Sequence, residues 1–596
     1  MRHPSLNEAT IRSHTTAQSY ERGEAYYRKG AVVALTQRGD TLTGEVEGSE
    51  YEPYRVTLQF DAGGLTRTHC TCAYGLQGWC KHIVATLLVS LHNPAKIEHR
   101  PSLSELLKPL NRDQLQTILA NLATEQSALI DTIESQIQQT VLSQPIASKQ
   151  VARRTVARRT VIDPQPFRRQ VQQIIYNAEG DWDDTSALNE ISVLVDKAYD
   201  FTNKGDGDNA LIILEAIIDA YGEIWMNLDG SSGESGDFFY ELDAAFTEAL
   251  LSATITPADQ VKWQDKLDVW AEGASEYGID DAFARSQTAL EQGWDSPILQ
   301  AVLQGEMADG SELEEPDSIG AMTLVQIRLN ILERQDRDDE YLNLAKATAH
   351  WQSYLTRLVE LGQLELAMTQ AKQHLNSATT ALAVAQALRE KGALDQALEI
   401  AESGLALPGL GKAQLALWTS ELAEGLGHQN TGLQARITAF EAAPTLADYL
   451  KIQELAEVAE WPKLQQDLLD GLRKRNVFAD KAAVAIFLRE GLLEDAINVV
   501  DQLSSFQAAL IKQVMEAAMS QRPDWVITNA RRRAESIMDE GKAKYYQYAV
   551  EWLTMACSAY QQAGQQQDWQ RYYAELLQKH TRKRKLINLL QALRQP

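Results

Sequence analysis

The sequence predicts an α+β zinc finger domain at the N-terminus, followed by a predominantly α-helical solenoid. Three observations favour this fold class. Three of the four cysteines and one histidine lie within residues 70–82. The residues before this cluster alternate as β-strands do, and those after residue 92 repeat apolar side chains at helical spacing. At 596 residues the chain is also too long for one hydrophobic core, which favours several units or a repeat array.

The N-terminal domain is expected to contain a short helix and a small antiparallel sheet. Residues 16–30 carry aromatic and small side chains at helical spacing and end in glycine, which commonly stops a helix. Residues 31–35 and 41–47 flank a turn and are rich in β-branched side chains, so we expect a hairpin. Residues 54–60 repeat the alternation and predict a third strand.

A Cys-x-Cys pair and a Cys-x-His pair follow this sheet. Cys70 and Cys72 are two residues apart, so on a strand they would share one face. Cys80 and His82 precede the apolar run of residues 83–91, which predicts a buried helix with both ligands at its start. Such a spacing can close a tetrahedral thiolate and imidazole site around zinc.

Other interpretations of the cluster are a disulfide, isolated buried thiols or a redox pair, and His69 is an alternative ligand. Zinc is favoured because the fourth ligand is a histidine at matching spacing and because four cysteines in so long a chain do not form a disulfide scaffold. Four protein ligands leave no position for water, so we expect one structural Zn2+ that helps a small domain to fold.

The ligand pattern, preceded by the helix that contains Ser19-Tyr20-Glu21-Arg22-Gly23 and by a small sheet, resembles the SWIM zinc finger. The resemblance covers roughly the first hundred residues. It implies one zinc held by Cys70, Cys72, Cys80 and His82, and a finger that binds DNA or protein. The chain would then comprise a finger domain (1–95), a helical extension (96–145), a basic linker (146–170) and an acidic α-helical repeat region (171–596).

Two side chains next to the ligands are candidates for contact with a partner. Trp79 and Lys81 would project from a rigid knuckle, where an aromatic ring and a cation could meet an unstacked base and a phosphate. Further cations of the same small domain are Arg22, Arg28, Lys29, Arg55 and Arg67. In the alternative interpretation, Trp79 covers the core of the finger and the charges only keep the domain soluble.

The expected linker contains a five-residue unit written twice, at residues 151–160. It could tether phosphate or the acidic body, or it could be a solvated hinge.

The remaining chain is expected to form paired helices. A glycine followed by alanine five positions later recurs, as at Gly362 and Gly392, which lie 30 residues apart. This pattern resembles tetratricopeptide repeats, whose period is about 34 residues, and its irregular spacing favours a degenerate α-solenoid. Such solenoids present extended surfaces, so we expect protein partners to dock on the helical repeats.

Charge is distributed unevenly along the chain. Through Ile175 there are 20 Lys and Arg against 16 Asp and Glu, a net +4, whereas the remainder holds 36 against 66, a net −30. An acidic body repels nucleic acid, so any phosphate contact should come from the N-terminal part or from local basic islands.

No run approaches the ~20 apolar residues that span a bilayer, so we expect a cytoplasmic protein without a membrane partner. Cys557 lies in an apolar helical pattern and is expected to be a buried, unreactive thiol.

No catalytic constellation is recognised in the sequence. Residues 205–210 mimic a dinucleotide fingerprint but follow a helical pattern, and residues 408–413 lack the hydroxyl of a phosphate-binding loop. We therefore expect a protein that is not an enzyme and has no small-molecule substrate. The favoured hypothesis is an adaptor whose finger contacts DNA or a DNA-associated protein. The alternatives are a purely protein-binding scaffold with the finger as a structural cap, and an enzyme with an unrecognised site.

Overall fold

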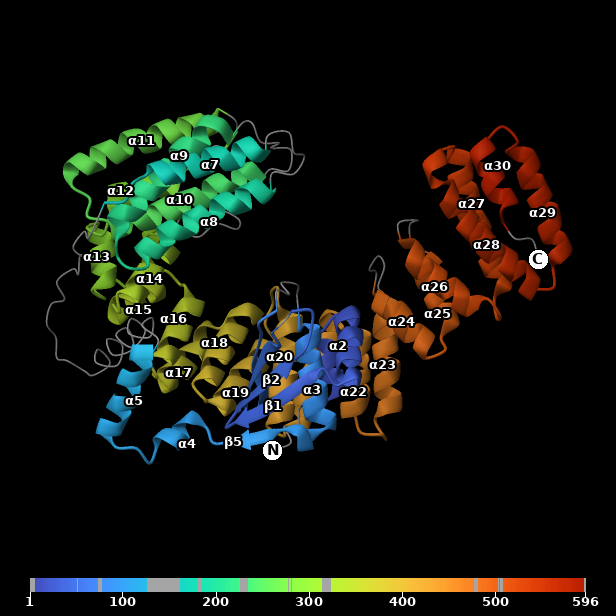
Figure 1. The fold of residues 1–596 in the computed structure, drawn as a ribbon, viewed down its shortest axis with the longest axis horizontal. Coiled ribbons are helices and arrows are strands. Elements are labelled where there is room, and N and C mark those ends of the chain that lie inside the picture. Colours follow the sequence, from blue (N-terminus) through green and yellow to red (C-terminus); the bar gives the residue numbers. More distant parts are fainter. Residues whose placement is uncertain are drawn as a thin grey trace. The chain divides into compact units, whose positions relative to one another are not determined.

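The protein is described by a computed structural model that covers most of the chain (Figure 1). The described residues are 6–50, 52–72, 78–125, 161–178, 185–225, 234–276, 278–279, 281–313, 323–475, 481–501, 503 and 507–593. They form two compact units. The first comprises Met1–Asn111, Asn376–Ala385 and Leu394–Pro596, and the second comprises Arg112–Leu375 and Gln386–Ala393.

The N-terminal part of the first unit combines a five-stranded sheet with helices. Its elements are α1 (Glu8–Ser13), α2 (Ala17–Lys29), β1 (Val32–Arg38), β2 (Thr41–Val46), β3 (Tyr54–Asp61), β4 (Gly64–Cys70), α3 (Lys81–His92), the 3-10 helix η1 (Pro94–Lys96), β5 (Glu98–Arg100) and α4 (Leu103–Leu107). The strand order is β4-β3-β2-β1-β5. Strands β1 to β4 pair antiparallel, whereas β5 pairs parallel with β1.

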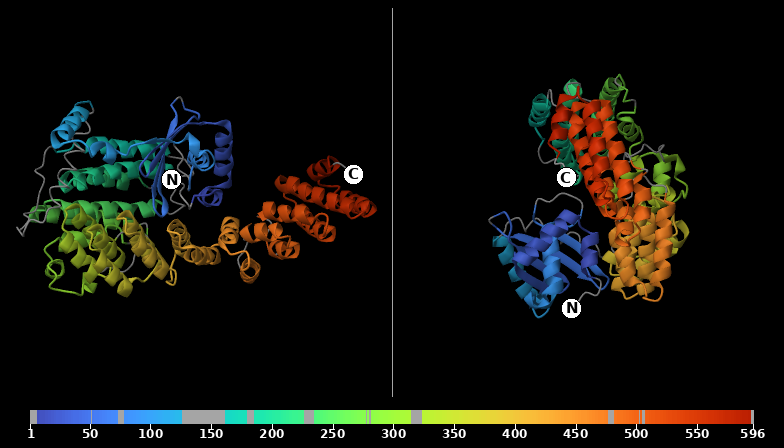
Figure 2. Two further views of the ribbon diagram at one scale, coloured as in Figure 1. Left: turned by 90° about the horizontal axis from the view of Figure 1, so that it is seen from below. Right: turned by 90° about the vertical axis from the view of Figure 1, so that its right-hand side faces the viewer.

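One face of this sheet forms the core of the finger domain. Alternate residues of β3, namely Val56, Leu58 and Phe60, are buried beneath α3. The blue elements in Figures 1 and 2 show α3 against the sheet, with α2 beside it. Helices α2 and α3 approach closely because Gly23 has no side chain: a Cβ there would lie 2.5 Å from Val84. The opposite face of the sheet carries polar side chains and faces solvent.

The predicted elements of this domain are confirmed, and β4, β5 and α1 are additional to them. The expected helix is α2, and Gly30 ends it in the left-handed conformation (φ 72°). The sheet is mixed rather than wholly antiparallel, because β5 adds a parallel edge strand. Helix α1 was also not predicted. Strand β5 is three exposed polar residues, so it has no apolar alternation to reveal it.

The helical extension is described only as far as residue 125, so the rest of residues 96–145 and most of the expected linker (146–170) lie outside the described residues. A capping box of Ser102 and Glu105 begins α4. Helix α5 (Arg112–Glu125) belongs to the second unit. Their apolar side chains are not packed into a core: Leu103, Leu106, Ile118, Leu119 and Leu122 are exposed by 39–68%.

Beyond residue 160 the described chain contains helices and no strands, as predicted. The second unit holds α7 (Gln165–Ala178), α8 (Thr185–Thr202), α9 (Gly207–Ile224), α10 (Glu234–Ser252), α11 (Pro257–Ser275), α12 (Ala284–Gln292), α13 (Pro297–Leu303), the 3-10 helix η4 (Ser311–Leu313), α14 (Leu324–Arg334), α15 (Asp338–Ala347), α16 (Trp351–Glu360) and α17 (Leu364–His374). Helix α18 (Ala378–Glu390) is shared between the two units.

The first unit continues with α19 (Leu394–Gly404), α20 (Lys412–Gly425), α21 (Gln429–Ala442), α22 (Leu446–Leu455), α23 (Trp461–Lys474), α24 (Lys481–Arg489), α25 (Leu493–Asp501), α26 (Ala508–Ala518), α27 (Pro523–Glu540), the 3-10 helix η6 (Ala543–Tyr545), α28 (Tyr546–Gln562), α29 (Gln566–Lys579) and α30 (Arg584–Gln591). From α20 to α22 and from α24 to α28, each helix packs on the next, as in a solenoid. None of the described helices is long and apolar enough to cross a bilayer.

The recurring glycine and alanine pattern has a clear structural meaning. Each glycine follows a helix and adopts a positive φ, which lets the chain turn, and each alanine is fully buried where the next helix packs. The glycines are Gly205, Gly362, Gly392 and Gly491, with φ of 73–76°, and the alanines, all 0% exposed, are Ala210, Ala367, Ala397 and Ala496.

Candidate metal centre

The four predicted ligands come from two neighbouring elements. Cys70 is the last residue of β4 and Cys72 follows two residues later. Cys80 is the N-cap of α3, in an extended conformation, and His82 lies in the first turn of that helix. Pairing of Cys70 with Val56 on β3 places the end of β4 beside the sheet core. The hydrophobic side of α3 packs on this sheet, which brings the start of the helix to the same place.

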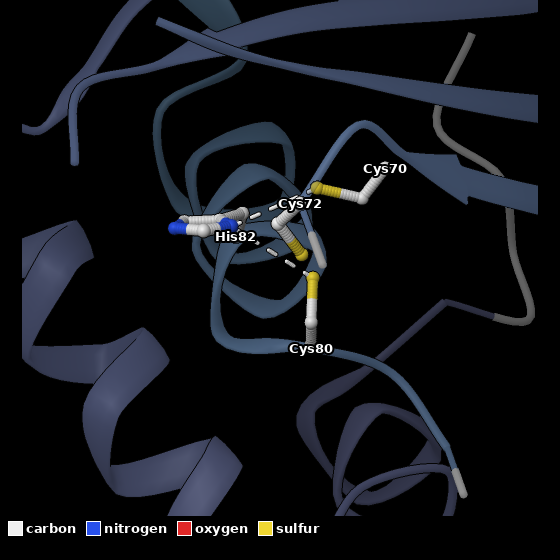
Figure 3. Close-up of side chains that lie close together, drawn as sticks. All are labelled: Cys70, Cys72, Cys80 and His82. Carbon is white, nitrogen blue, oxygen red and sulfur yellow. Dashed lines mark hydrogen bonds between the residues drawn. The ribbon is translucent and has the colours of Figure 1, made fainter. Parts of the chain in front are cut away.

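The donor atoms of these residues converge, as Figure 3 shows. The three sulfur atoms and one ring nitrogen of His82 all lie within 4.8 Å of one another. The Sγ atoms of Cys70 and Cys80 are 3.7 and 4.0 Å from Nδ1 of His82. Around one zinc ion, bond lengths of about 2.3 Å to sulfur and about 2.0 Å to nitrogen would separate these atoms by roughly 3.6 Å. The donor set and its spacing therefore fit one tetrahedral zinc ion.

The protonation of the cysteines also suits a metal site. The pKa of Cys80 is lowered to about 4, mainly by a hydrogen bond from Cys70. Burial raises this pKa, and a hydrogen bond with His82 lowers it further. The hydrogen bond between Cys70 and Cys80, followed by burial, raises the pKa of Cys70. A thiolate at Cys80 is the form that binds metal, and a cation could replace the proton that the two sulfur atoms share.

Aromatic rings hold the imidazole of His82 in place. Tyr54 stacks on it at a centroid distance of 4.2 Å, and Tyr26 approaches it edge-on at 5.5 Å. Gly48 makes room for this arrangement, because a Cβ there would lie 2.4 Å from the ring of Tyr54. Nε2 of His82 is buried without a hydrogen-bond partner among the described residues, while Nδ1 faces the sulfur atoms. The ring is thus oriented to offer Nδ1 to a metal.

Neither Trp79 nor Lys81 projects freely from the knuckle. The ring of Trp79 stacks on His14 at 4.5 Å, and its backbone N–H donates a hydrogen bond to the carbonyl oxygen of His14. Nζ of Lys81 lies 4.8 Å from the ring centroid of Tyr26. Both side chains therefore have partners inside the protein.

The other predicted contact residues fall into two groups that the structure does not bring together. Arg22, Arg28 and Lys29 lie exposed on α2, where Arg28 forms an ion pair with Glu24 at 2.7 Å. Arg55 and Arg67 lie on the solvent face of the sheet, on the neighbouring strands β3 and β4. His69, the alternative ligand, points to this solvent face and not toward the cysteines.

The finger also contacts the helices that follow it within the first unit, which the sequence did not predict. Nε2 of His14 lies 2.8 Å from Oε1 of Glu421 on α20, and Asn7 donates a hydrogen bond to Glu454 on α22. At the start of β4, Gly63 approaches α20 so closely that a Cβ on Gly425 would lie 2.1 Å from its carbonyl oxygen.

A buried charge network lies behind this contact. Arg436 on α21 is 1% exposed and pairs with Asp448 at 3.0 Å, and it also lies 3.8 Å from Glu424. Lys451 in turn pairs with Glu424 at 2.8 Å. Burial lowers the pKa of His14, but the ion pair and hydrogen bond with Glu421 outweigh this effect, so the pKa of His14 is raised. The sequence could not reveal the pair of His14 and Glu421, because the two residues are 407 positions apart and His14 belongs to no motif.

Comparison with known proteins agrees with this geometry. Residues 54–90, which include all four ligands, match the SWIM zinc finger family model. The chain therefore contains a SWIM zinc finger. It is similar to Zinc finger SWIM domain-containing protein 8 from Bos taurus and from Homo sapiens, at 34% identity over 128 residues, and to the homolog from Drosophila melanogaster, at 33% over 125 residues.

These matches cover 20% of the present chain and 6–9% of the relatives. The chain thus spans less than a tenth of the length of the curated relatives it matches. The similarity concerns about 128 residues and leaves most of the long helical region without a counterpart in these matches.

Proposed function

We propose that this protein is a non-enzymatic adaptor. Its SWIM finger, folded around one structural zinc ion, contacts DNA or a DNA-associated protein, and its helical repeats dock protein partners. The observation that carries this proposal is the closed Cys70, Cys72, Cys80 and His82 site, in which four converging protein donors would fill a tetrahedron. A closed site supports folding and presentation of a surface, and it does not supply an open coordination position for catalysis.

The charge distribution supports different partners for the finger and for the helical repeats. The chain beyond Ile175 carries a net charge of −30, which disfavours contact between the helical repeats and nucleic acid. The finger is near neutral overall, but Arg55 and Arg67 gather on its exposed sheet face. The helical repeats present the extended surfaces on which peptides and helices commonly dock.

A second candidate function is a protein-binding scaffold in which the finger is a structural cap. The contact of His14 with Glu421 favours it, because the finger then covers the charge network around Arg436. In this case the finger has no partner outside the chain, and its loss would weaken the helices α20 to α22 that it covers.

Fluorescence anisotropy of the full chain separates these candidates. Labelled duplex and single-stranded DNA of arbitrary sequence would be titrated across a salt series, with wild type compared with Cys72→Ser. The adaptor proposal expects binding that weakens with salt and requires the intact finger. No binding of either DNA at low salt would remove the DNA arm of the proposal. The protein arm would then be tested by cross-linking wild type and Cys72→Ser to co-purified proteins: loss of cross-links to the finger in the variant would support it.

A further inference from the structure

The solvent face of the finger sheet is a continuous polar surface, which we call the open sheet face. Its cross-strand register aligns two rows of side chains that run from β4 to β5. The first row is Arg67, Gln59, Thr41, Arg38 and Arg100, and the second is His69, Thr57, Thr43, Thr36 and Glu98. Val56, Leu58 and Phe60 alternate with these residues on β3 and point to the core, which fixes the rows on the opposite face.

Cations on this face are available for an external partner. Arg55 and Arg67 are exposed, and neither forms an ion pair within the described residues. Arg38 is exposed as well: it donates one hydrogen bond to the carbonyl oxygen of Pro101, and its charge acts on nearby Glu98, whose pKa it helps to lower, but it forms no ion pair within the described residues. Most arginines of the helical units, in contrast, form ion pairs with carboxylates. Arg357, for example, pairs with three carboxylates and Arg473 with two.

Carboxylates on this face are few, and the first row contains none. Glu98 accepts two hydrogen bonds from Arg100, at 2.8 and 3.0 Å. Glu45 lies directly opposite Arg55 in the register of β2 and β3. Arg38 and Arg67 are therefore the cations without an acidic neighbour in their row, and the row between them offers only the neutral hydrogen-bonding groups of Gln59 and Thr41.

The chemistry of the face matches a phosphate backbone. Arginine binds phosphate oxygens through paired N–H donors, and threonine, glutamine and histidine also donate to them. The three strand spacings from β4 to β1 separate Arg67 from Arg38 by about 14 Å, close to the ~12 Å width of the major groove of duplex DNA. The rows contain no Phe, Tyr or Trp, and His69 is their one aromatic ring, so a run of stacked bases, as in proteins that bind single strands, has no platform here.

We infer that the open sheet face binds the phosphate backbone of duplex nucleic acid, with Arg38 and Arg67 as its two principal phosphate contacts and with little readout of base sequence. This inference rests on the proposed function, because it assigns the DNA contact of the finger to a specific surface. We assign the DNA contact to this surface and not to the residues around Trp79, because the ring of Trp79 is already stacked on His14.

The test compares two charge-matched double variants of the full chain. Arg38→Gln/Arg67→Gln removes two cations from the open sheet face. Lys108→Gln/Arg112→Gln removes two exposed cations from the segment around the start of α5, off the sheet, and serves as the control. Zinc content and circular dichroism should match wild type in both. Fluorescence anisotropy with a duplex of arbitrary sequence then gives the dissociation constant at each salt concentration.

Wild type should bind the duplex more tightly than the matching single strand. The sheet-face variant should bind the duplex at least several-fold more weakly at low salt, and the slope of log K against log salt should fall by about 2, since each lost phosphate contact removes ~0.9. The control should keep the wild-type slope.

Equal duplex affinity and slope in the sheet-face variant and wild type would overturn this inference and leave the proposed function standing. Preference of wild type for the single strand would also overturn it. Absence of duplex binding by wild type at low salt would overturn both this inference and the DNA arm of the proposed function.

Discussion

His14 and Glu421 form an ion pair in which Nε2 and Oε1 are 2.8 Å apart, and this pair links the zinc finger to helix α20 across 407 residues of sequence. The same imidazole ring of His14 also stacks on the ring of Trp79, the residue next to the ligand Cys80. The knuckle of the metal site is thus coupled to the helical part of the first unit through one imidazole.

The His14 pair should make the stability of the first unit depend on pH. The folded state raises the pKa of His14 above its ordinary value of 6.5, so the stabilisation is fully present below about 6.5 and is lost as pH rises through the raised pKa. Differential scanning calorimetry from about pH 5.5 to about pH 8.5 should show the Tm difference between wild type and Glu421→Gln shrinking as pH rises. His14→Asn should behave like Glu421→Gln. A difference that stays constant with pH would contradict this assignment.

Substitution of a ligand should release the metal. Purified wild type is expected to contain one zinc per chain, and Cys72→Ser or His82→Ala should lose most of it, because three donors bind zinc far more weakly than four. Elemental analysis after gel filtration measures this ratio. Cys557→Ser is the matched control, since Cys557 is buried on α28 and should not affect zinc content. Full zinc retention in either ligand variant would refute the ligand set.

Adding one methyl group at Gly425 should loosen the contact between β4 and α20. The new Cβ of Gly425→Ala would lie 2.1 Å from the carbonyl oxygen of Gly63, so the backbones must move apart, at a cost of about 1–3 kcal/mol. Hydrogen exchange should show faster exchange in α1 and α20. Gly471→Ala on α23 is the control: no atom lies within 4 Å of its Cβ, and helix propensity predicts a gain of up to ~1 kcal/mol. Equal exchange in both variants would contradict the close approach.

Breaking the buried ion pair of Arg436 should destabilise the first unit strongly. Asp448→Ala would leave Arg436, which is 1% exposed, without its partner at 3.0 Å, and such a loss typically costs about 3–5 kcal/mol. Urea unfolding measures this change. Asp470→Ala removes a carboxylate from the surface pair with Arg473, and it should change stability by less than ~1 kcal/mol. Similar effects of the two substitutions would show that the Arg436 network contributes no more than a surface pair.

The metal site and the paired helices could be predicted from the sequence because their signals are local. Cys70, Cys72, Cys80 and His82 lie within 13 residues, and zinc chemistry restricts what such a cluster can do. The glycine and alanine pattern was likewise predictive, because a positive φ favours glycine and a close helix contact favours alanine.

The features that escaped prediction depend on partners far away in the chain. Asn7 meets Glu454 and His14 meets Glu421, and neither N-terminal residue belongs to a periodic pattern that would reveal its partner. Strand β5 is defined by pairing with β1, because its own three residues are polar and exposed. The orientation of Trp79 was also ambiguous in the sequence, because an aromatic residue beside a ligand can face inward or outward, and its stacking partner His14 lies far from it in the chain.

The parallel pairing of β5 with β1 has a practical consequence for preparing shorter fragments. The family match at residues 54–90 contains only β3, β4 and α3, whereas the sheet is completed by β1 and β2 upstream and by β5 downstream. A fragment trimmed to the match would expose the backbone edge of β3 that β2 normally covers, and unpaired edges promote aggregation. A fragment that retains every strand together with α1 and α2 runs from Glu8 through Arg100, so it extends ten residues beyond the end of the family match.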